Sequence, residues 1–296
     1  MSRIALVTAG AARDLDEDLK PLIDAVSESG IEFDVPAWDD PTVNWSTFDL
    51  AVLRSTWDYT SRLAEFLDWA DRAGSQTRLV NPLEMIRWNT DKHYLGDLAR
   101  AGVASVPSRF IEPQEDAEHH IDHFLVAHAS DEFVVKPSVG AGSRDAQRYG
   151  REERERAVAH ARRLLDGGRS VLLQPYLSRV DDHGETALVY FDGTFSHAIR
   201  KGPLLRRGEG PTRALFAAEH ITARTPSAQE LRVAESALAA IPFAKPLLYA
   251  RVDLIRDGAD SPCVLELELT EPSLFFAHSE GSAQRFVRAI STRLQP

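Results

Sequence analysis

Three carboxylates in the last fifty residues have the spacing that could hold a divalent cation. Glu266 and Glu268 are two residues apart in the strand-like segment 263–269, so both side chains point to the same face of that strand. Asp253 lies in the strand-like segment 248–256 just before it. Carboxylates that converge on one face repel each other unless a cation lies between them, and hard oxygen ligands favour Mg²⁺ or Mn²⁺.

The same alternation of acidic and apolar residues fits a strand that has one solvated face. Alternating glutamates are common on such strands, and the leucines between them would then face the core. The acidic residues alone leave a metal site and a solvated face equally open.

A second group of residues could bind phosphate. Lys136 ends the apolar run 133–135 and is followed by small residues that include Ser138, Gly140 and Gly142. The lysine supplies a point charge, and glycines let backbone N–H groups approach phosphate oxygens. The segment lacks the G-x-x-x-x-G-K-S/T pattern of a P-loop. A glycine turn beside a surface lysine is the alternative.

Further basic residues could complete an anion site. Lys92, Arg200, Lys201 and Arg213 are each explained as solvated surface charges when taken singly. Beside an acidic metal face they would supply the cations that a nucleotide triphosphate needs. No Ser/His/Asp or Cys/His arrangement points to a covalent nucleophile.

The first 84 residues alternate strand and helix signals and predict a parallel α/β domain. Strands are expected at 4–9, at 31–38, within 48–59 where a strand runs into a polar loop, and at 78–82, with helices at 14–30 and 61–74 that each stop at a glycine. Ligands gather at the carboxyl ends of such strands. Arg54, Thr56 and Asp58 follow one strand and could bind the carboxylate and ammonium groups of an amino acid. Trp57 and Tyr59 could instead pack a domain interface.

The remaining residues predict a mixed helix and strand part. One helix is expected over 85–102, strands at 133–138 and 171–177, a hairpin over 185–203 that turns at Asp192-Gly193, and a long loop over 202–218. Helices are expected at 151–168, at 225–241 and at the end of the chain.

The composition argues against several classes of function. A net charge of −11 disfavours a broad nucleic-acid-binding face, and no apolar run is long enough to cross a membrane. The single cysteine, Cys263, excludes an internal disulfide and indicates a buried residue in a cytoplasmic protein.

The order of several segments resembles the ATP-grasp superfamily, most closely glutathione synthetase and D-alanine–D-alanine ligase. The segments are NTDK (89–92), VVKPSVGAGS (134–143), QPYL (174–177), GET (184–186), ARVDLI (250–255) and LELELTEPS (265–273). The resemblance implies an α/β fold, α+β in its ATP-binding part, with a Rossmann-like domain at 1–84 and ATP-grasp lobes at 85–178 and 179–296.

The resemblance also implies roles for individual residues. Lys92, Lys136 and Lys201 would reach the ATP phosphates, and Glu185 the ribose. The hinge strand of Gln174, Pro175, Tyr176 and Leu177 would meet adenine, while Arg200 and Arg213 would contact the transferred phosphate and the substrate carboxylate. Asp253, Glu266 and Glu268 would hold two Mg²⁺ ions, although the family usually has Asn at the position of Glu268. Ser273 would face the substrate.

The implied reaction phosphorylates a carboxylate with ATP and then forms a C–N bond from the acylphosphate. The segments VLRSTWDY, WNTDK and ELELTEPSLFF resemble most the ligases that cyclise O-ureido-D-serine to D-cycloserine. An intermolecular amino-acid or peptide ligase and a non-catalytic nucleotide-binding module are the alternatives. The expected partner is a small amino-acid-like substrate, with no nucleic acid and no membrane, for a monomer or homodimer.

Overall fold

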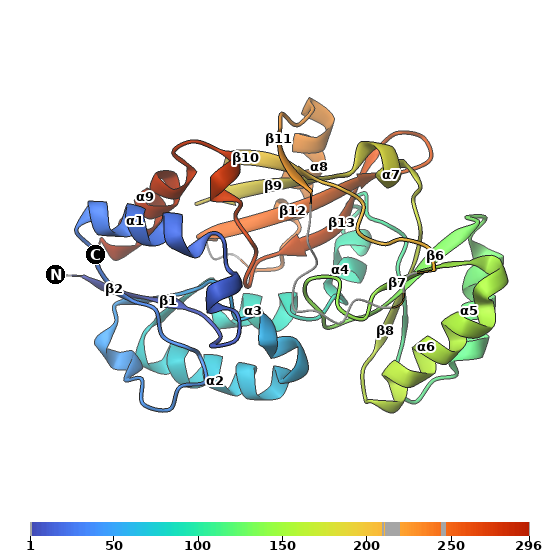
Figure 1. Cartoon of the computed structure of the whole chain (residues 1–296), viewed down its shortest axis with the longest axis horizontal. Helices are drawn as coiled ribbons and strands as arrows, with labels where there is room; N and C mark the ends of the chain where they lie inside the picture. Colours follow the sequence, from blue (N-terminus) through green and yellow to red (C-terminus); the bar gives the residue numbers. More distant parts are fainter. Residues whose placement is uncertain (1, 209, 211–219, 244–246, 296) are drawn as a thin grey trace.

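The chain builds three sheets that meet around one central region. The computed structural model describes residues 2–208, 210, 220–243 and 247–295. Figure 1 shows the N-terminal sheet at the left, a lobe carrying α5 and α6 at the right, and the long strands β9, β10, β12 and β13 above and between them.

The N-terminal sheet is parallel, with strand order β2-β1-β3-β4. Ile4 and Leu6 of β1 pack with α1 and the C-terminal helix α9, while Ala5 and Val7 pack with α2, because successive residues of a strand face opposite sides. Both faces are therefore buried, as parallel sheets require. The elements are β1 (Arg3–Val7), α1 (Leu19–Ser29), β2 (Glu32–Asp34), β3 (Leu50–Leu53), α2 (Leu63–Gln76) and β4 (Arg78–Val80), with short 3₁₀ helices at Arg13–Leu15, Trp45–Thr47 and Trp57–Ser61.

Two of the expected helix ends in this domain need correction. The first helix begins only at Leu19, because residues 13–15 form a separate 3₁₀ turn. It ends at Gly30 as predicted, and this glycine is left-handed with φ 74°. The second helix continues through Gly74 to Gln76, so the predicted glycine stop was wrong.

The helix expected over 85–102 is two helices, α3 (Leu83–Asn89) and α4 (Tyr94–Arg100). Asn89 ends the first, since its amide donates to Leu267 O at 2.7 Å and accepts from Leu269 N at 2.6 Å. Lys92 therefore lies in the break, and its backbone N–H donates to Ser138 O at 3.0 Å. The break brings Lys92 to the loop after β6.

The lobe at the right of Figure 1 is an antiparallel sheet covered on one side by two helices. Its strand order is β5-β8-β6-β7, and the helices α5 and α6 pack with it around Phe133, Tyr149 and Leu173. The elements are β5 (Arg109–Ile111), α5 (Ala117–Ala127), β6 (Glu132–Pro137), β7 (Gln147–Gly150), a 3₁₀ helix (Arg151–Glu153), α6 (Arg154–Asp166) and β8 (Val171–Pro175).

The C-terminal sheet is antiparallel, with strand order β11-β10-β9-β12-β13. The hairpin predicted at Asp192-Gly193 is confirmed, and both residues have positive φ as this tight turn needs. Strands β12 and β13 pair antiparallel, with Asp253 opposite Glu266. The elements are α7 (Arg179–His183), β9 (Glu185–Phe191), β10 (Thr194–Lys201), β11 (Ile221–Arg224), α8 (Ala228–Ala239), β12 (Tyr249–Arg256), β13 (Pro262–Glu268), a 3₁₀ helix (Phe276–His278) and α9 (Ser282–Leu294).

The division at residues 84 and 178 stays a prediction. Tyr94 and Leu98 of α4 pack against Val252 and Leu267 of the C-terminal sheet, so this helix shares the core of the third sheet although it precedes the second in the chain.

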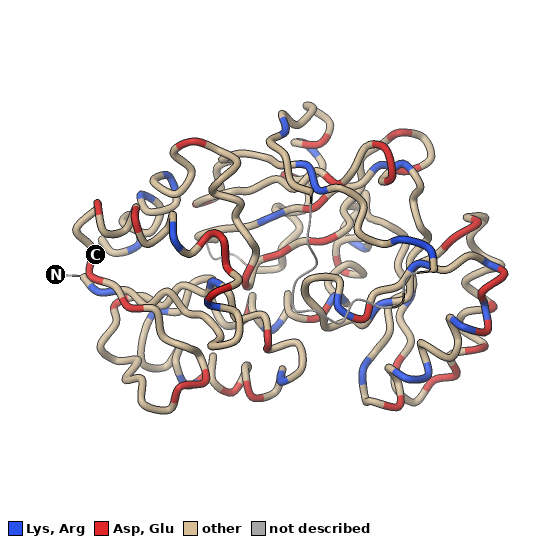
Figure 2. The backbone as a smooth tube through the Cα atoms, in the orientation of Figure 1, with Lys and Arg blue, Asp and Glu red and all other residues tan. Residues whose placement is uncertain are grey.

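Charges of both signs are spread over the molecule. Figure 2 shows basic and acidic segments alternating in each of the three parts of the chain. Within the described residues, no helix is both long and apolar enough to span a bilayer.

Candidate active site

One pocket lies where the three sheets meet. It is lined by side chains from the 3₁₀ helix Trp57–Ser61, the α3–α4 break, β6 and the loop after it, β8, β10, β12, β13 and the segment 271–275. It encloses about 1540 Å³ of empty space, including the part that opens to solvent.

One end of the pocket is apolar and is bounded by the strand β8 and the residues after it. Gln174, Pro175, Tyr176 and Leu177 all line the pocket, in the order predicted for an adenine-binding hinge. Apolar side chains from both lobes face them, which suits a flat aromatic base. These side chains are Val134, Leu205, Ile255 and Leu265.

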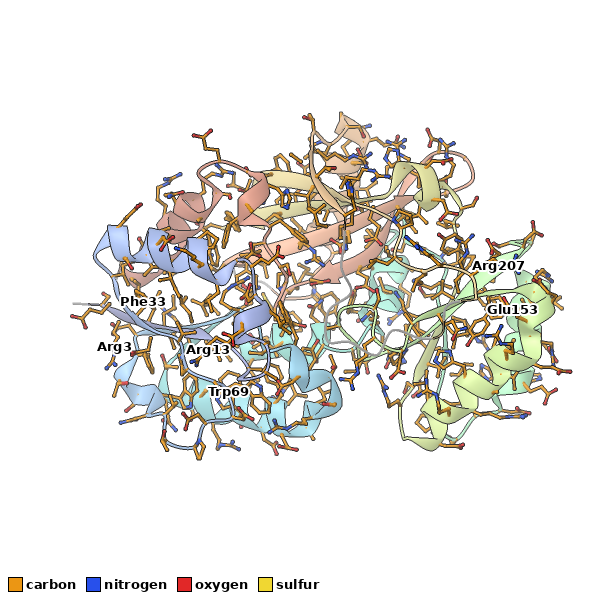
Figure 3. All side chains as sticks on the ribbon, in the orientation of Figure 1. Arg3, Arg13, Phe33, Trp69, Glu153 and Arg207 are labelled. Carbon is orange, nitrogen blue, oxygen red and sulfur yellow. The ribbon has the colours of Figure 1, made fainter. Side chains whose placement is uncertain are left out.

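The segment after β10 crosses this end and contacts the other lobe. Pro203, Leu204 and Leu205 line the pocket. Arg207 then lies 3.2 Å from Glu132 and 3.7 Å from Glu153, and Figure 3 shows Arg207 close to Glu153 on the lobe that carries α6. The segment therefore joins the C-terminal sheet to the central one across the pocket.

Two lysines and a glutamate form the next part of the wall. Lys136 Nζ donates to Glu266 Oε1 at 2.8 Å, and Lys92 Nζ lies 3.9 Å from the same oxygen. Lys92 Nζ also donates to Gly140 O at 2.7 Å. The structure thus brings together the two predicted phosphate-binding lysines with the glycine loop and one predicted metal ligand.

The other two predicted metal ligands are also paired with cations. Lys201 Nζ lies 2.7 Å from Asp253 Oδ2 and 2.8 Å from Glu185 Oε2. Arg251 donates to both oxygens of Asp253 at 2.8 and 2.9 Å and also pairs with Glu268. Asp253 is 1% exposed, while the Glu266 and Glu268 side chains are 24% and 28% exposed and line the pocket, so this face of the sheet is partly buried and each of its carboxylates is paired with a cation.

The pKa values follow from burial and these pairs. Burial would raise the pKa of Asp253 and of Glu266, but Arg251 and Lys201 lower the first and Lys136 and Lys92 hold the second well below its usual range. For Glu268, burial dominates over the nearby arginine and raises the pKa to about 7. The three carboxyl groups of the site therefore differ in pKa, which is lowered for Asp253 and Glu266 and raised for Glu268.

The donor set fits Mg²⁺ in its chemistry but not in the present side-chain positions. Hard carboxylate oxygens are the ligands Mg²⁺ prefers. In the described part of the chain, however, no three His, Cys, Asp or Glu side chains converge closely enough to hold a metal ion. Glu266 and Glu268 line the pocket, whereas Asp253 is 1% exposed and lies behind Lys201 and Arg251. The cations must turn toward a ligand before these carboxylates can share a metal.

The far end of the pocket, next to the N-terminal domain, is polar and aromatic. Its lining includes Trp57, Tyr59, Glu271, Ser273 and Phe275. Tyr59 interacts with the Glu271 carboxyl, and the Trp57 indole donates to Glu271 O at 3.1 Å. Burial, with a smaller contribution from Glu268, raises the pKa of Glu271 to about 8.

The other residues predicted for the substrate lie outside the pocket lining. Arg54 is 1% exposed, donates to Pro272 O at 2.9 Å and lies over the rings of Tyr249 and Phe286. Thr56 is fully buried, and Asp58 accepts from the Trp38 indole at 2.8 Å. Arg54 and Asp58 bond to other parts of the protein and Thr56 is buried, whereas their neighbours Trp57 and Tyr59 line the pocket.

Two further residues that were predicted to contact ATP or the substrate, Ser138 and Arg200, do not line the pocket. Ser138 is buried, and its backbone bonds Lys92 and Ser170. The Arg200 guanidinium donates to His183 O at 2.8 Å and Asp182 O at 3.0 Å, so it ties α7 to β10 and does not line the pocket. Arg213 lies outside the described residues. Gly140 and Gly142 line the pocket as expected.

Sequence reasoning missed Arg251 and Glu271 as polar lining residues, whereas Tyr59 was among the strand-end candidates for the substrate. Arg251 had a detectable signal, since it lies two residues before Asp253 and so shares its face of β12. Glu271 had none, because it follows the end of β13, where the alternation stops.

Comparisons with known proteins agree with this geometry. The chain is 43% identical to the cycloserine biosynthesis protein DcsG of Streptomyces lavendulae, and the match covers 100% of both chains. Residues 4–81 match the family model for the N-terminal domain of D-cycloserine synthetase DcsG. The chain belongs to the D-cycloserine synthetase family.

Solved structures support this assignment. The crystal structure of D-cycloserine synthetase DcsG superposes with a TM-score of 0.94 over 99% of this chain and 100% of that one, at 43% identity. D-alanine–D-alanine ligase from Bacillus anthracis, complexed with ATP, gives a TM-score of 0.68 at 15% identity over 99% and 97% of the two chains. The ATP-grasp ligase PsnB gives 0.66 at 15% identity over 98% and 99%. The predicted ATP-grasp fold and the class of ATP-dependent ligase are confirmed for this family member.

Proposed function

We propose that the chain uses ATP and Mg²⁺ to activate the carboxylate of O-ureido-D-serine and closes the ring of D-cycloserine. One observation carries the proposal. The apolar end of the pocket, its wall of paired lysines and carboxylates, and its polar end follow one another along the pocket, and the chain is 43% identical to DcsG. The order of these parts suits a base, a triphosphate and a small zwitterion.

The lysines and carboxylates would exchange partners when ATP binds. Lys92, Lys136 and Lys201 would turn to the phosphates, which frees Glu266, Asp253 and Glu185. Asp253, Glu266 and Glu268 would then hold Mg²⁺ or Mn²⁺, which would neutralise phosphate charge when bound. Two ions are expected from the resemblance to the superfamily.

Arg251 would direct the substrate carboxylate. Its guanidinium lines the pocket between Glu268 and the backbone carbonyl of Ser273, to which it donates at 3.0 Å. A planar guanidinium suits a carboxylate and the phosphoryl group transferred to it. Arg213 keeps its proposed contact with the same groups, whereas Arg200 would act only by holding α7.

The two steps need positioning more than a protein nucleophile. The carboxylate oxygen attacks the γ-phosphoryl group and ADP leaves. The ureido nitrogen next to oxygen then attacks the acyl carbon, the C–N bond forms, and the C–O bond to phosphate breaks. Cycloserine lacks the carbamoyl group of the substrate, so water must also cleave the bond from the ring nitrogen to the carbamoyl carbon, which releases CO₂ and NH₃ and leaves a proton on the nitrogen.

An ADP-release assay with product analysis tests the proposal. Purified protein with ATP and Mg²⁺ is expected to release ADP with O-ureido-D-serine and to form cycloserine, detected by mass. Free amino acids, singly and in pairs, serve as competing substrates. A linear amide product would favour an intermolecular ligase, and no ADP release with any carboxylate would favour a nucleotide-binding module.

The proposal includes a cytoplasmic enzyme that acts as a monomer or homodimer on a small amino-acid-like substrate. Size-exclusion chromatography with light scattering would measure the oligomeric state.

A further inference from the structure

Glu271 is the pocket carboxylate that the ATP and metal roles leave unused. It comes three residues after Glu268, past the end of β13, and lies at the polar end of the pocket next to Trp57 and Tyr59. Its residue is only 8% exposed.

The pairing of Glu271 differs from that of every other acidic residue in the lining. Glu185, Glu266 and Glu268 each form an ion pair with a lysine or arginine. Among the described residues, no lysine or arginine makes an ion pair with Glu271, and its side chain interacts with the neutral hydroxyl of Tyr59. A buried carboxyl group needs hydrogen-bond donors, and one hydroxyl satisfies only part of its four lone-pair sites.

The backbone around Glu271 is fixed from the N-terminal domain. Trp57 donates to Glu271 O at 3.1 Å, and Arg54 donates to the next carbonyl, Pro272 O, at 2.9 Å. The backbone is thus held by contacts that leave the carboxyl oxygens of Glu271 to Tyr59 and to a ligand in the pocket that this residue lines.

We propose that Glu271, oriented by Tyr59, accepts a hydrogen bond from the attacking N–H group of the substrate and so positions that nitrogen for ring closure. The inference rests on the proposed function and deepens it. Arg251 and Glu271 both line the polar end, so the pocket offers a cation for the activated carboxylate and an acceptor for the nitrogen. Such a pair folds a flexible acyclic substrate toward its cyclic product, and alignment of reacting groups contributes strongly to rate.

The assignment predicts a selective defect in the second step. The acylphosphate forms without the nitrogen, so Glu271→Gln should still release ADP in the presence of O-ureido-D-serine. Hydroxylamine added to the assay traps the acylphosphate as a hydroxamate, whereas ring closure gives cycloserine. We expect the ratio of cycloserine to hydroxamate to fall about tenfold or more, since the amide of the variant replaces one acceptor oxygen with an N–H donor that cannot accept from the substrate nitrogen.

Three comparisons make the test specific. Tyr59→Phe keeps the aromatic packing and removes only the hydroxyl, so it should lower the same ratio by a smaller factor. Glu28→Gln, on the exposed face of α1, should change nothing. O-Methyl-D-serine has the carboxylate but no ureido N–H, so its conversion to hydroxamate should be the same in Glu271→Gln and in the parent protein.

Each outcome decides the matter. An unchanged product ratio in both variants overturns the inference and leaves the proposed function intact. Equal loss of cycloserine and hydroxamate, in a variant that Mg-ATP still stabilises against heat, also overturns it, because Glu271 would then act on activation. Should Glu271→Gln fail to fold, the ratio in Tyr59→Phe decides. Absence of ADP release in the parent protein contradicts the proposed function itself, and this is seen before any variant is made.

Discussion

At the scale of single residues, the charged side chains of the pocket form ion pairs with one another. Lys136 with Glu266, Lys201 with Asp253, and Arg251 with Glu268 each place a cation against a carboxylate. Taking an isolated charge out of water costs several kcal/mol, so a buried partner is needed while no ligand is bound. We infer that the same residues serve the free protein as ion pairs and the liganded protein as phosphate and metal contacts.

Lys136→Ala tests this dual use. The variant should need about 10- to 100-fold more ATP for half-maximal rate, because one charged hydrogen bond to phosphate is lost. The fold should persist, since Lys92 remains 3.9 Å from Glu266. Steady-state kinetics and circular dichroism measure both effects. Lys20→Ala, at an exposed pair on α1, is the control, and equal ATP requirements in the two variants would contradict the assignment.

His160 gives a pH prediction that is independent of the active site. Burial, with a smaller effect of Arg163, lowers its pKa to about 4, and its Nδ1 lies 3.0 Å from the Tyr149 hydroxyl. The unfolded histidine has a pKa of about 6.5, so between pH 6.5 and 4 the unfolded chain binds the proton and the native chain does not.

The free energy of unfolding should therefore fall as the pH drops through this window, by at most about 3 kcal/mol from this residue. His160→Gln should remove this part of the loss. Urea unfolding at pH 7 and pH 4.5, for the parent and the variant, measures it. His119→Gln on exposed α5 is the control, and the same pH dependence in all three proteins would refute the prediction.

At the scale of elements, the segment after β13 is held by residues distant in sequence. Asp18, at the start of α1, accepts from the backbone N–H groups of Leu274, Phe275 and Phe276 at 2.5, 3.0 and 2.8 Å. Phe275 has φ 53°, a conformation unfavourable for a side chain of that size. Asp18 thus helps to hold the loop that also carries Glu271 and Ser273.

Asp18→Asn should loosen this loop. An amide offers one oxygen in place of two and no charge, so we expect a loss of about 2 kcal/mol in the free energy of unfolding and weaker substrate binding. Asp24→Asn on the exposed face of the same helix is the control. Denaturant unfolding and the substrate concentration for half-maximal rate measure the two effects. Matching stability of the two variants would show that the contacts contribute little.

At the scale of the whole molecule, the pocket exists only because three sheets meet. The phosphate lysines come from the α3–α4 break and from β6, the carboxylates from the C-terminal sheet, and the substrate end from the N-terminal domain. No single sheet could form this pocket by its own packing. The helices α1 and α9 share one hydrophobic core, and this core links the first and third sheets. Ligand binding should therefore stabilise all three sheets together.

Mg-ATP at 100 times its dissociation constant should stabilise the protein by about 2.7 kcal/mol and raise the melting temperature in one transition by several degrees. EDTA should remove most of this shift in melting temperature, because the ATP phosphates then lack Mg²⁺. Differential scanning calorimetry measures it, with Lys136→Ala as the variant of reduced response. Two transitions, of which only one moves, would contradict shared binding by the three sheets.

Much of the local structure could be predicted from the amino-acid order alone. Periodicity placed most of the longer strands and helices, though not the short β7, α7 and β11, and Asp192-Gly193 and Gly30 specified their turns because positive φ is a local requirement. The spacing of Glu266 and Glu268 put both on one face. The order of short segments was enough to indicate the ATP-grasp superfamily.

Which charges face the pocket could be learned only from the packing of the three sheets. Arg54 and Arg200 have the residue type of an anion site, yet both bond to backbone carbonyls away from it. Trp57 and Glu271 meet although 214 residues separate them in the chain. Periodicity tells which face a side chain occupies, whereas burial and pairing depend on the element that covers this face, and that element comes from elsewhere in the chain.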